Sequence, residues 1–273
     1  MPPGAVDTHA HVIGLPPAYP FVNDRSYTPP AATAEQYLSM LDAAGMAYGV
    51  LVQVSVHGID NRLMLQTLRS NRTRLRGIAV MPLGLPESDY ADAKAAGVVG
   101  LRLNDLYGGG IDFSQLREYG ALAKEMGWHL QFLLDGRQLP RLAPEMSKLP
   151  VPFVVDHMGH FELAGMTVDD TNFQTLVSLV RDGGWVKLSG AYRQSALEPP
   201  YEDTVPYAQC LLDAGPSRCV WGSDWPHVAN WKTMMHVHDL LDTLALWAPT
   251  RAQQHAILVD NPSELYGFER APR

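Results

Sequence analysis

Eight short apolar runs recur along the chain, and their regular spacing limits the fold more than any other feature of the sequence. The runs begin about every 30 residues, which is the length of one strand–helix–strand step in a parallel sheet. They are Val6–His11, Gly49–Val54, Arg76–Val80, Gly100–Leu103, His129–Leu133, Phe153–Asp156, Trp185–Leu188 and Cys219–Trp221. Four of the intervening segments show helical spacing of apolar residues: Thr33–Ala44, Phe113–Met126, Asn172–Val180 and Trp231–Trp247. The pattern therefore predicts alternating strands and helices.

The number of these units and the length of the chain favour one closed α/β barrel. A single (β/α)8 TIM barrel over residues 1–273 fits, because such a barrel needs about 250 residues. An open doubly wound sheet is the alternative, but it usually carries a glycine fingerprint after its first strand. Here Gly14 is followed by Leu-Pro-Pro, and the run Gly108–Gly110 lacks the lysine of a phosphate loop. We expect a long loop at Pro16–Pro30 and, from Thr250 onward, one or two helices packed outside the barrel.

The composition narrows the classes of partner. Lysine and arginine number 21 and aspartate and glutamate 29, which gives a formal charge of −8, and no basic cluster suited to nucleic acid is present. An anionic small molecule would therefore need a local group of arginines. The first residues lack the pattern of a signal peptide, no apolar run reaches the roughly 20 residues of a membrane helix, and Cys210 and Cys219 suggest no disulfide framework. We expect a cytoplasmic protein without membrane or nucleic-acid partners and leave its oligomeric state open.

Polar side chains stand at the carboxyl ends of six predicted strands, which is where a barrel carries its active site. His9 and His11 are two positions apart, so both imidazoles can point to one face of the first strand. The other strand ends supply Gln53 and Ser55, Arg102 and Asn104, Asp156 and His157, Tyr192 and Arg193, and Asp224 and His227. A single buried histidine is usually structural, but six polar strand ends in register are unusual for buried parallel strands. We therefore predict a functional site around His9, His11, His157 and Asp224.

Several other polar residues fit structural roles at least as well. Asp7 and Asp156 precede histidines within apolar strands and suit the support of a neighbouring histidine. His57 and His160 fall in loops of the barrel mouth, where substrate contact and a structural role are both open. His129 begins the fifth strand at the opposite end of the barrel, so we expect it to be structural.

The strand-end motifs resemble those of the amidohydrolase superfamily. The resemblance rests on Asp7-Thr8-His9-Ala10-His11, Asp156-His157-Met158-Gly159 and Gly222-Ser223-Asp224-Trp225-Pro226-His227, with support from Gln53–Val56, Gly100–Asn104 and Val259–Pro262. More narrowly, the chain is similar to the lactonase branch, which includes 2-pyrone-4,6-dicarboxylate lactonases and sugar lactonases. The resemblance covers nearly the whole chain. It implies a distorted (β/α)8 barrel and a hydrolase that opens a cyclic ester.

The resemblance leaves two modes of catalysis. Most amidohydrolases bind one or two divalent ions, and zinc hydrolysis generally needs three protein ligands and a water. His9, His11 and Asp224 would hold a single zinc or manganese ion here. However, the fifth strand has no histidine near its carboxyl end, and Arg102 would repel a metal. Because the pyrone-dicarboxylate lactonases that the chain resembles act without metal, we favour a site without a cofactor.

The mechanism implied by this resemblance gives each group a role. Asp224 is the general base that takes a proton from water, while His9, His11 and His157 polarise the lactone carbonyl and stabilise the oxyanion. Arg102 and Arg193 hold a carboxylate of a small anionic lactone. Further substrate contacts come from Gln53, Ser55, Asn104, Tyr192 and His227.

Two positions depart from the pyrone-dicarboxylate lactonases. Gly108 stands where a second arginine is expected after Arg102, and Leu133 replaces a tyrosine of the fifth strand. Fewer cations predict a substrate with fewer carboxylates, such as an aldonic or aldaric lactone. The alternatives are a metal-dependent hydrolase or decarboxylase of the same superfamily, a sugar-lactone isomerase, and a non-enzymatic ligand-binding barrel, which would not need Asp224.

Overall fold

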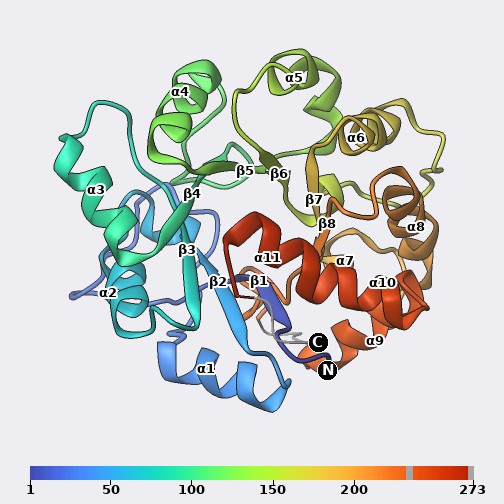
Figure 1. The fold of residues 1–273 in the computed structure, drawn as a ribbon, viewed down its shortest axis with the longest axis horizontal. Helices are drawn as coiled ribbons and strands as arrows, with labels where there is room; N and C mark the ends of the chain where they lie inside the picture. Colours follow the sequence, from blue (N-terminus) through green and yellow to red (C-terminus); the bar gives the residue numbers. More distant parts are fainter. Residues whose placement is uncertain (232–235, 270–273) are drawn as a thin grey trace.

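Eight parallel strands follow one another around a barrel in the order of the sequence, with helices surrounding them (Figure 1). The protein is represented by a computed structural model that describes residues 1–231 and 236–269. The strands are β1 (Val6–Ala10), β2 (Tyr48–Val52), β3 (Leu75–Ala79), β4 (Val98–Asn104), β5 (His129–Leu133), β6 (Phe153–Val155), β7 (Trp185–Leu188) and β8 (Cys219–Trp221). Every strand lies at the predicted place, with ends shifted by at most two residues. The predicted (β/α)8 barrel is therefore confirmed.

Helices connect the strands and continue after β8. They are α1 (Ala34–Ala43), α2 (Arg62–Ser70), α3 (Glu87–Ala96), α4 (Leu116–Met126), α5 (Leu139–Met146), α6 (Thr171–Arg181), α7 (Ala191–Gln194), α8 (Val205–Ala214), α9 (Val237–Trp247), α10 (Arg251–His255) and α11 (Asn261–Tyr266). Short 3-10 helices occur at Ser55–His57, Gly136–Gln138, His157–Gly159 and Glu202–Thr204, and a π-helical segment at Ala256–Asp260. None of the helices in the described part of the chain is long and apolar enough to cross a membrane.

The four helices predicted from apolar spacing correspond to α1, α4, α6 and α9. In α1 the capping box is formed, since Thr33 Oγ1 accepts from Gln36 N and Gln36 Oε1 accepts from Thr33 N. Helix α4 begins three residues later than predicted, because the Asp112 carboxylate accepts from Ser114 N and Ser114 Oγ in a turn that precedes it. Part of the fourth predicted helix, residues 232–235, lies outside the described residues.

The seam between β8 and β1 closes the barrel through residues that follow β8. Thr8 Oγ1 donates to Trp221 O at 2.8 Å, and Asp224 N donates to His9 O at 2.8 Å. Ala10 pairs with Trp225 as an isolated parallel bridge. The seam therefore holds the segment that carries Asp224 directly against the strand that carries the two predicted histidines.

The predicted long loop after β1 is present and crosses the barrel mouth. Val22 N donates to Val56 O, Gly108 N to Ser26 Oγ and Gly109 N to Asp24 Oδ2. These bonds tie the loop after β1 to the loops after β2 and β4. Gly109 has a φ of +84°, and a Cβ at this position would lie 2.3 Å from Ser55 O, so the close approach of these loops requires glycine.

The tail forms the helices expected from Thr250 onward, and the last of them covers one end of the barrel (Figure 1). Helix α11 crosses the amino-terminal end of the barrel (Figure 1), and Tyr266 and Phe268 pack against interior side chains, Val6, Val50, Val52 and Ile78. The Tyr266 ring lies 5.3 Å from that of His129, the residue that begins β5. The interior at this end is lined by medium-sized aliphatic side chains, and the aromatic rings of the tail fill the remaining space.

Candidate active site

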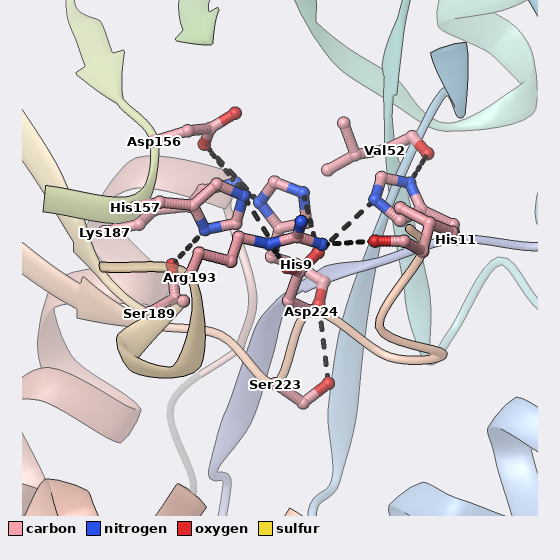
Figure 2. A network of polar contacts seen from close by, with 12 residues as sticks. His9, His11, Val52, Asp156, His157, Lys187, Ser189, Arg193, Ser223 and Asp224 are labelled. Carbon is pink, nitrogen blue, oxygen red and sulfur yellow. Dashed lines mark hydrogen bonds and ion pairs between the residues drawn. The ribbon is translucent and has the colours of Figure 1, made fainter. Parts of the chain in front are cut away.

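The four predicted catalytic side chains meet at the carboxyl end of the barrel, with Asp224 between the three histidines (Figure 2). His11 Nε2 lies 3.5 Å from Asp224 Oδ1, and His9 Nε2 lies 3.8 Å from the same oxygen. His157 Nε2 lies 3.8 Å from Asp224 Oδ2. All four residues are buried. The structure therefore brings this group together as one cluster, although the catalytic roles remain predictions.

The local backbone turns these side chains toward one another. The register between β1 and β2 shifts after Asp7, and the rings of His9 and His11 lie 5.0 Å apart. His157 and Asp224 have φ values of 50° and 58°, in the left-handed region that residues other than glycine seldom adopt. Such conformations are frequent at functional sites, because the surrounding structure must hold them in place.

Hydrogen bonds on the far side of two imidazoles fix their orientation. His11 Nδ1 donates to Val52 O at 2.8 Å, and His157 Nδ1 is 2.8 Å from Ser189 Oγ. The Nε2 atom of each ring is thereby turned toward Asp224 (Figure 2). A ring held in this way can act on a bound molecule without first reorienting.

Asp224 is held as a carboxylate by its other neighbours. Arg193 Nε donates to Asp224 Oδ2 at 2.8 Å, and Tyr192 Oη donates to the same oxygen at 2.5 Å. Burial alone would raise the pKa of Asp224, but Arg193 and the nearby histidines outweigh burial and hold this pKa well below its ordinary value. Asp224 is therefore ionised at neutral pH.

His9, His157 and His227 are neutral beside this carboxylate. Burial and the charge of Lys187 lower the pKa of His9 to about 3, although Asp156 and Asp224 oppose the shift. Burial also lowers the pKa of His157 well below its ordinary value, and that of His227 to about 4. A neutral imidazole offers one N–H donor and one acceptor nitrogen, so the position of its proton decides its chemistry.

The two predicted anion-binding arginines lie at different depths. Arg193 lines a cavity of about 730 Å³ beside the cluster, together with His160 and the segment Phe161–Glu162. Arg102 is buried deeper, where its guanidinium lies 3.6 Å from Asp156 Oδ2 and donates to Gln53 O at 3.2 Å. Arg193 is therefore the arginine placed to meet a ligand in the cavity.

The other predicted substrate contacts are divided between the site and the loops. Gln53 Nε2 donates to Gly58 O and Asp60 O. Asn104 donates to Ser55 Oγ and Tyr107 O. These amides organise the mouth loops. The His227 ring lies 5.3 Å from that of Tyr192, and neither of its nitrogens has a hydrogen-bond partner among the described residues.

Three residues expected to suit structural roles have structural contacts. Asp7 accepts from Ser223 N and Oγ, His9 N and Tyr37 Oη, and thereby ties β1 to the segment after β8. His57 accepts from Gly14 N and donates to Pro20 O, which holds the loop after β1. His129 lies at the end of the barrel that α11 covers.

Four residues near the cluster were not predicted from the sequence. Tyr27 and Tyr107 come from the loops after β1 and β4, their rings lie 5.6 Å apart, and Arg193 donates to Tyr107 Oη at 3.4 Å. No sequence signal beyond their position in mouth loops distinguishes these tyrosines. Lys187 and Gln131 lie inside the barrel and are completely buried. Lys187 interrupts the apolar run Trp185–Leu188, and this interruption is the sequence signal that could have identified it.

One group of potential metal donors occurs in the described part of the chain. Donor atoms of His9, His157 and Asp224 lie within 4.8 Å of one another, so His157 takes the place that the sequence analysis gave to His11. Two histidines and a carboxylate are a donor set that zinc accepts. However, a metal ion would share Asp224 with Arg193 and Tyr192, which already donate hydrogen bonds to its Oδ2.

Comparison with known proteins agrees with this arrangement. The amidohydrolase family model matches residues 6–268. This chain belongs to the amidohydrolase family. A 4-sulfomuconolactone hydrolase from Hydrogenophaga intermedia is 36% identical over 273 residues, which cover 98% of this chain and 90% of the relative. A 2-pyrone-4,6-dicarboxylate hydrolase from Comamonas testosteroni is 35% identical over 97% of this chain and 91% of its own length.

Two further comparisons bear on the branch of the amidohydrolase family. A D-galactarolactone isomerase from Agrobacterium fabrum is 30% identical over 97% of this chain and 92% of its own length. The crystal structure of a probable 2-pyrone-4,6-dicarboxylic acid hydrolase from Acinetobacter baumannii, with citric acid bound, matches with a TM-score of 0.85 and 28% identity. The match covers 97% of this chain and 100% of that structure. These relatives place the chain in the lactonase branch.

Proposed function

We propose that this amidohydrolase hydrolyses a small anionic lactone by water attack on the ring ester, without a bound metal. The observation that carries the proposal is the convergence of three imidazoles on one ionised carboxylate, beside an arginine that faces a cavity. The names of the relatives support the substrate class, since two are lactone hydrolases. The family model covers nearly the whole chain, so we also propose that residues 1–273 form one functional unit.

In this proposal Asp224 is the general base, and Arg193 controls its strength. The ion pair with Arg193 makes Asp224 a weak base while no substrate is bound. A substrate carboxylate or sulfonate in the cavity attracts the guanidinium, because Arg offers a planar fork of donors to such anions. Asp224 then loses its closest cation, and its pKa rises toward the range in which a carboxylate removes a proton from water effectively.

In this proposal the histidines polarise the lactone carbonyl, which is the role that a metal ion has in other hydrolases. Nε2–H groups of neutral imidazoles donate to the lactone carbonyl and to the oxyanion that forms when water adds. His9 and His157 can present Nε2–H donors on the side of Asp224, where water and carbonyl would meet. His11 Nδ1 donates to Val52 O, so His11 can donate from Nε2 as well only when both of its ring nitrogens carry a proton. Asp224 Oδ1 has no hydrogen-bond partner among the described residues and is open to a ligand, but Arg193 on Asp224 Oδ2 places a positive charge beside the donor group, which disfavours a divalent ion.

The substrate carries few anionic groups in this proposal. Arg193 is the cavity-lining arginine that also contacts the cluster, whereas Arg137, which lines the same cavity, pairs with Asp135, and Arg102 pairs with Asp156. We therefore retain the expectation that lactones with one carboxylate or sulfonate react faster than 2-pyrone-4,6-dicarboxylate. We also propose a cytoplasmic location, since Cys210 and Cys219 are both free thiols.

A sugar-lactone isomerase is the second candidate, favoured by the match to a D-galactarolactone isomerase. The same histidines would then stabilise an acyl group that moves between two hydroxyls of the substrate. NMR of the products separates the two activities, because isomerisation gives a rearranged lactone and hydrolysis gives an open acid.

A lactone panel tests the proposal directly. The purified enzyme is treated with a chelator, its metal content is measured, and hydrolysis of 4-sulfomuconolactone, galactarolactone, an aldonolactone and 2-pyrone-4,6-dicarboxylate is followed with a pH indicator. We expect turnover of galactarolactone or the aldonolactone, which carry at most one anionic group, to exceed that of the pyrone and to survive chelation. Activity that disappears with the metal and returns with zinc or manganese would support the metal-dependent alternative.

A further inference from the structure

A buried lysine lies directly below the histidine cluster and has no role in the mechanism above. Lys187, from the middle of β7, is completely buried inside the barrel. Its Nζ donates to Thr8 O at 2.9 Å and to Gln131 Oε1 at 2.8 Å. It also lies 3.3 Å from His9 Nδ1 and 3.4 Å from Asp156 Oδ1 (Figure 2). A buried ammonium without a function is costly to retain, so this contact with a predicted catalytic histidine needs an explanation.

The two neighbours of His9 Nδ1 favour opposite tautomers. Asp156 Oδ1 lies 3.4 Å from Nδ1 and would accept a proton from it, which would leave a lone pair on Nε2. Lys187 would instead donate to Nδ1, which requires the imidazole proton to sit on Nε2. The tautomer decides whether His9 Nε2 is an acceptor or a donor toward the space beside Asp224.

The available protons and the surrounding charges favour the tautomer in which His9 Nε2 is a donor. Lys187 has three N–H groups, and two are used by Thr8 O and Gln131 Oε1, so the third can reach His9 Nδ1 at 3.3 Å, next to Asp156 Oδ1 at 3.4 Å. The charge of Asp156 is balanced by other groups, since its Oδ2 accepts from Gln131 Nε2 at 2.9 Å and lies 3.6 Å from Arg102, and its Oδ1 lies 3.4 Å from Lys187 Nζ. Two cations therefore surround one carboxylate at the Nδ1 end of the ring, whereas the carboxylate of Asp224 faces the Nε2 end.

We propose that Lys187 is a positioning residue that fixes His9 in the Nε2–H tautomer. His9 then donates to the lactone carbonyl and offers no Nε2 lone pair to a metal. Histidines that bind metals usually donate their second N–H to a carboxylate or carbonyl, and here an ammonium reverses that arrangement. The inference rests on the proposed metal-free lactonase. It identifies Lys187 as the residue that favours catalysis without a metal.

The tautomer can be measured without a substrate. In protein labelled with ¹⁵N-histidine, ¹H–¹⁵N correlations distinguish protonated from unprotonated ring nitrogens, and the His9→Gln variant identifies the signals of His9. We expect the wild-type spectrum to show His9 protonated at Nε2. A wild-type ring protonated at Nδ1 would overturn the proposal even if every variant failed to fold.

Lys187→Met removes the donor and keeps an unbranched side chain of similar length. We expect His9 in this variant to carry its proton on Nδ1, directed to Asp156. Zn²⁺ affinity, measured by competition with a chromophoric chelator, should rise about tenfold or more, because a carboxylate partner strengthens a histidine ligand. Unchanged tautomer and unchanged Zn²⁺ affinity in the folded variant would contradict the proposal.

Two matched variants separate this role from general effects. Asp156→Asn removes the competing negative charge and leaves Lys187, so His9 should remain protonated at Nε2. Lys148→Met removes an exposed lysine that pairs with Glu145 and should change neither the spectrum nor the Zn²⁺ affinity. Because these measurements need no turnover, a failed lactone panel with the expected spectra would reject the substrate and leave the role of Lys187 intact.

Discussion

At the scale of single residues, the site depends on a few charges held away from water. Asp224 is the one carboxylate that three histidines, Tyr192 and Arg193 all approach. Its charge is maintained by Arg193, and His9 and His157 remain neutral because they are buried. The cluster therefore combines an ionised base with neutral hydrogen-bonding groups, which is what water attack on an ester requires.

Replacing Asp224 with asparagine tests the base. The amide has nearly the same shape but cannot take a proton from water, so kcat for the best lactone of the panel should fall by about 10³-fold. Circular dichroism and thermal unfolding should show that the variant stays folded. Asp42→Asn, which alters an exposed ion pair with Arg74, is the control and should keep wild-type activity. Near wild-type turnover by the Asp224 variant would reject the assignment.

Asp7 gives a prediction about pH and stability. Burial raises its pKa from 3.8 to about 6, against the hydrogen bonds from Ser223 and His9. The folded state therefore holds this proton more tightly than the unfolded state does. The contribution of Asp7 to the free energy of unfolding is fully present below pH 4. It is lost as the pH rises through 6, and the total loss is about 3 kcal/mol.

The comparison with Asp7→Asn isolates this effect, because asparagine does not titrate and the Ser223 and Tyr37 hydroxyls can turn to accept from its amide. The difference in unfolding free energy between wild type and variant should change by about 3 kcal/mol between pH 4 and pH 7, in favour of the variant at higher pH. Denaturant unfolding at several pH values measures it. A difference independent of pH would show that Asp7 titrates normally.

Residues at strand ends were predictable, whereas residues inside strands and loops were not. His9, His11, His157 and Asp224 stand out because polar side chains interrupt apolar runs at the same end of parallel strands. Lys187 belongs to such a run itself, and its importance depends on Gln131 and Asp156 from other strands. Those neighbours are known only after the strands are placed in a barrel.

At the scale of elements, the spacing of the apolar runs predicts the barrel, whereas contacts between loops determine the shape of its mouth. Each strand could be located because a buried parallel strand is a continuous apolar run. Backbone N–H groups of Gly108 and Gly109 bond to the loop after β1, and Val22 N of that loop bonds to Val56 O after β2. No periodicity of the sequence indicates these contacts. These bonds place Tyr27 beside Tyr107 at the mouth.

Gly109→Ala tests whether this loop contact matters for catalysis. A methyl group would lie 2.3 Å from Ser55 O and would force the loops apart. We expect kcat/KM to fall by about 10- to 100-fold, mainly through KM, because small displacements at a site have large kinetic effects. Gly84→Ala is the matched control, since Gly84 also has a positive φ of 80° but has nothing within 4 Å of the added carbon. Equal effects of both substitutions would attribute the loss to backbone strain alone.

At the scale of the whole molecule, the two ends of the barrel have different tasks. The carboxyl end holds the ionised cluster, and the amino end is filled by Tyr266 and Phe268 from the tail. Helices in the tail were predictable, but their position was not, because apolar spacing shows that a helix is buried without showing against what. That residues 1–273 act as one unit remains a prediction.

Tyr266→Ala tests this division of tasks. Tyr266 is 1% exposed, and its removal leaves a cavity among Val6, Val50 and Ile78, so the free energy of unfolding should fall by about 3–5 kcal/mol. Leu246→Ala, at a position that is 40% exposed, should change it by about 0.5 kcal/mol or less. Below the unfolding temperature, kcat/KM of the Tyr266 variant should stay within about threefold of wild type, since in barrel enzymes this end serves stability and the opposite end serves catalysis. A large loss of activity in the folded variant would show that the filled end also controls the geometry of the site.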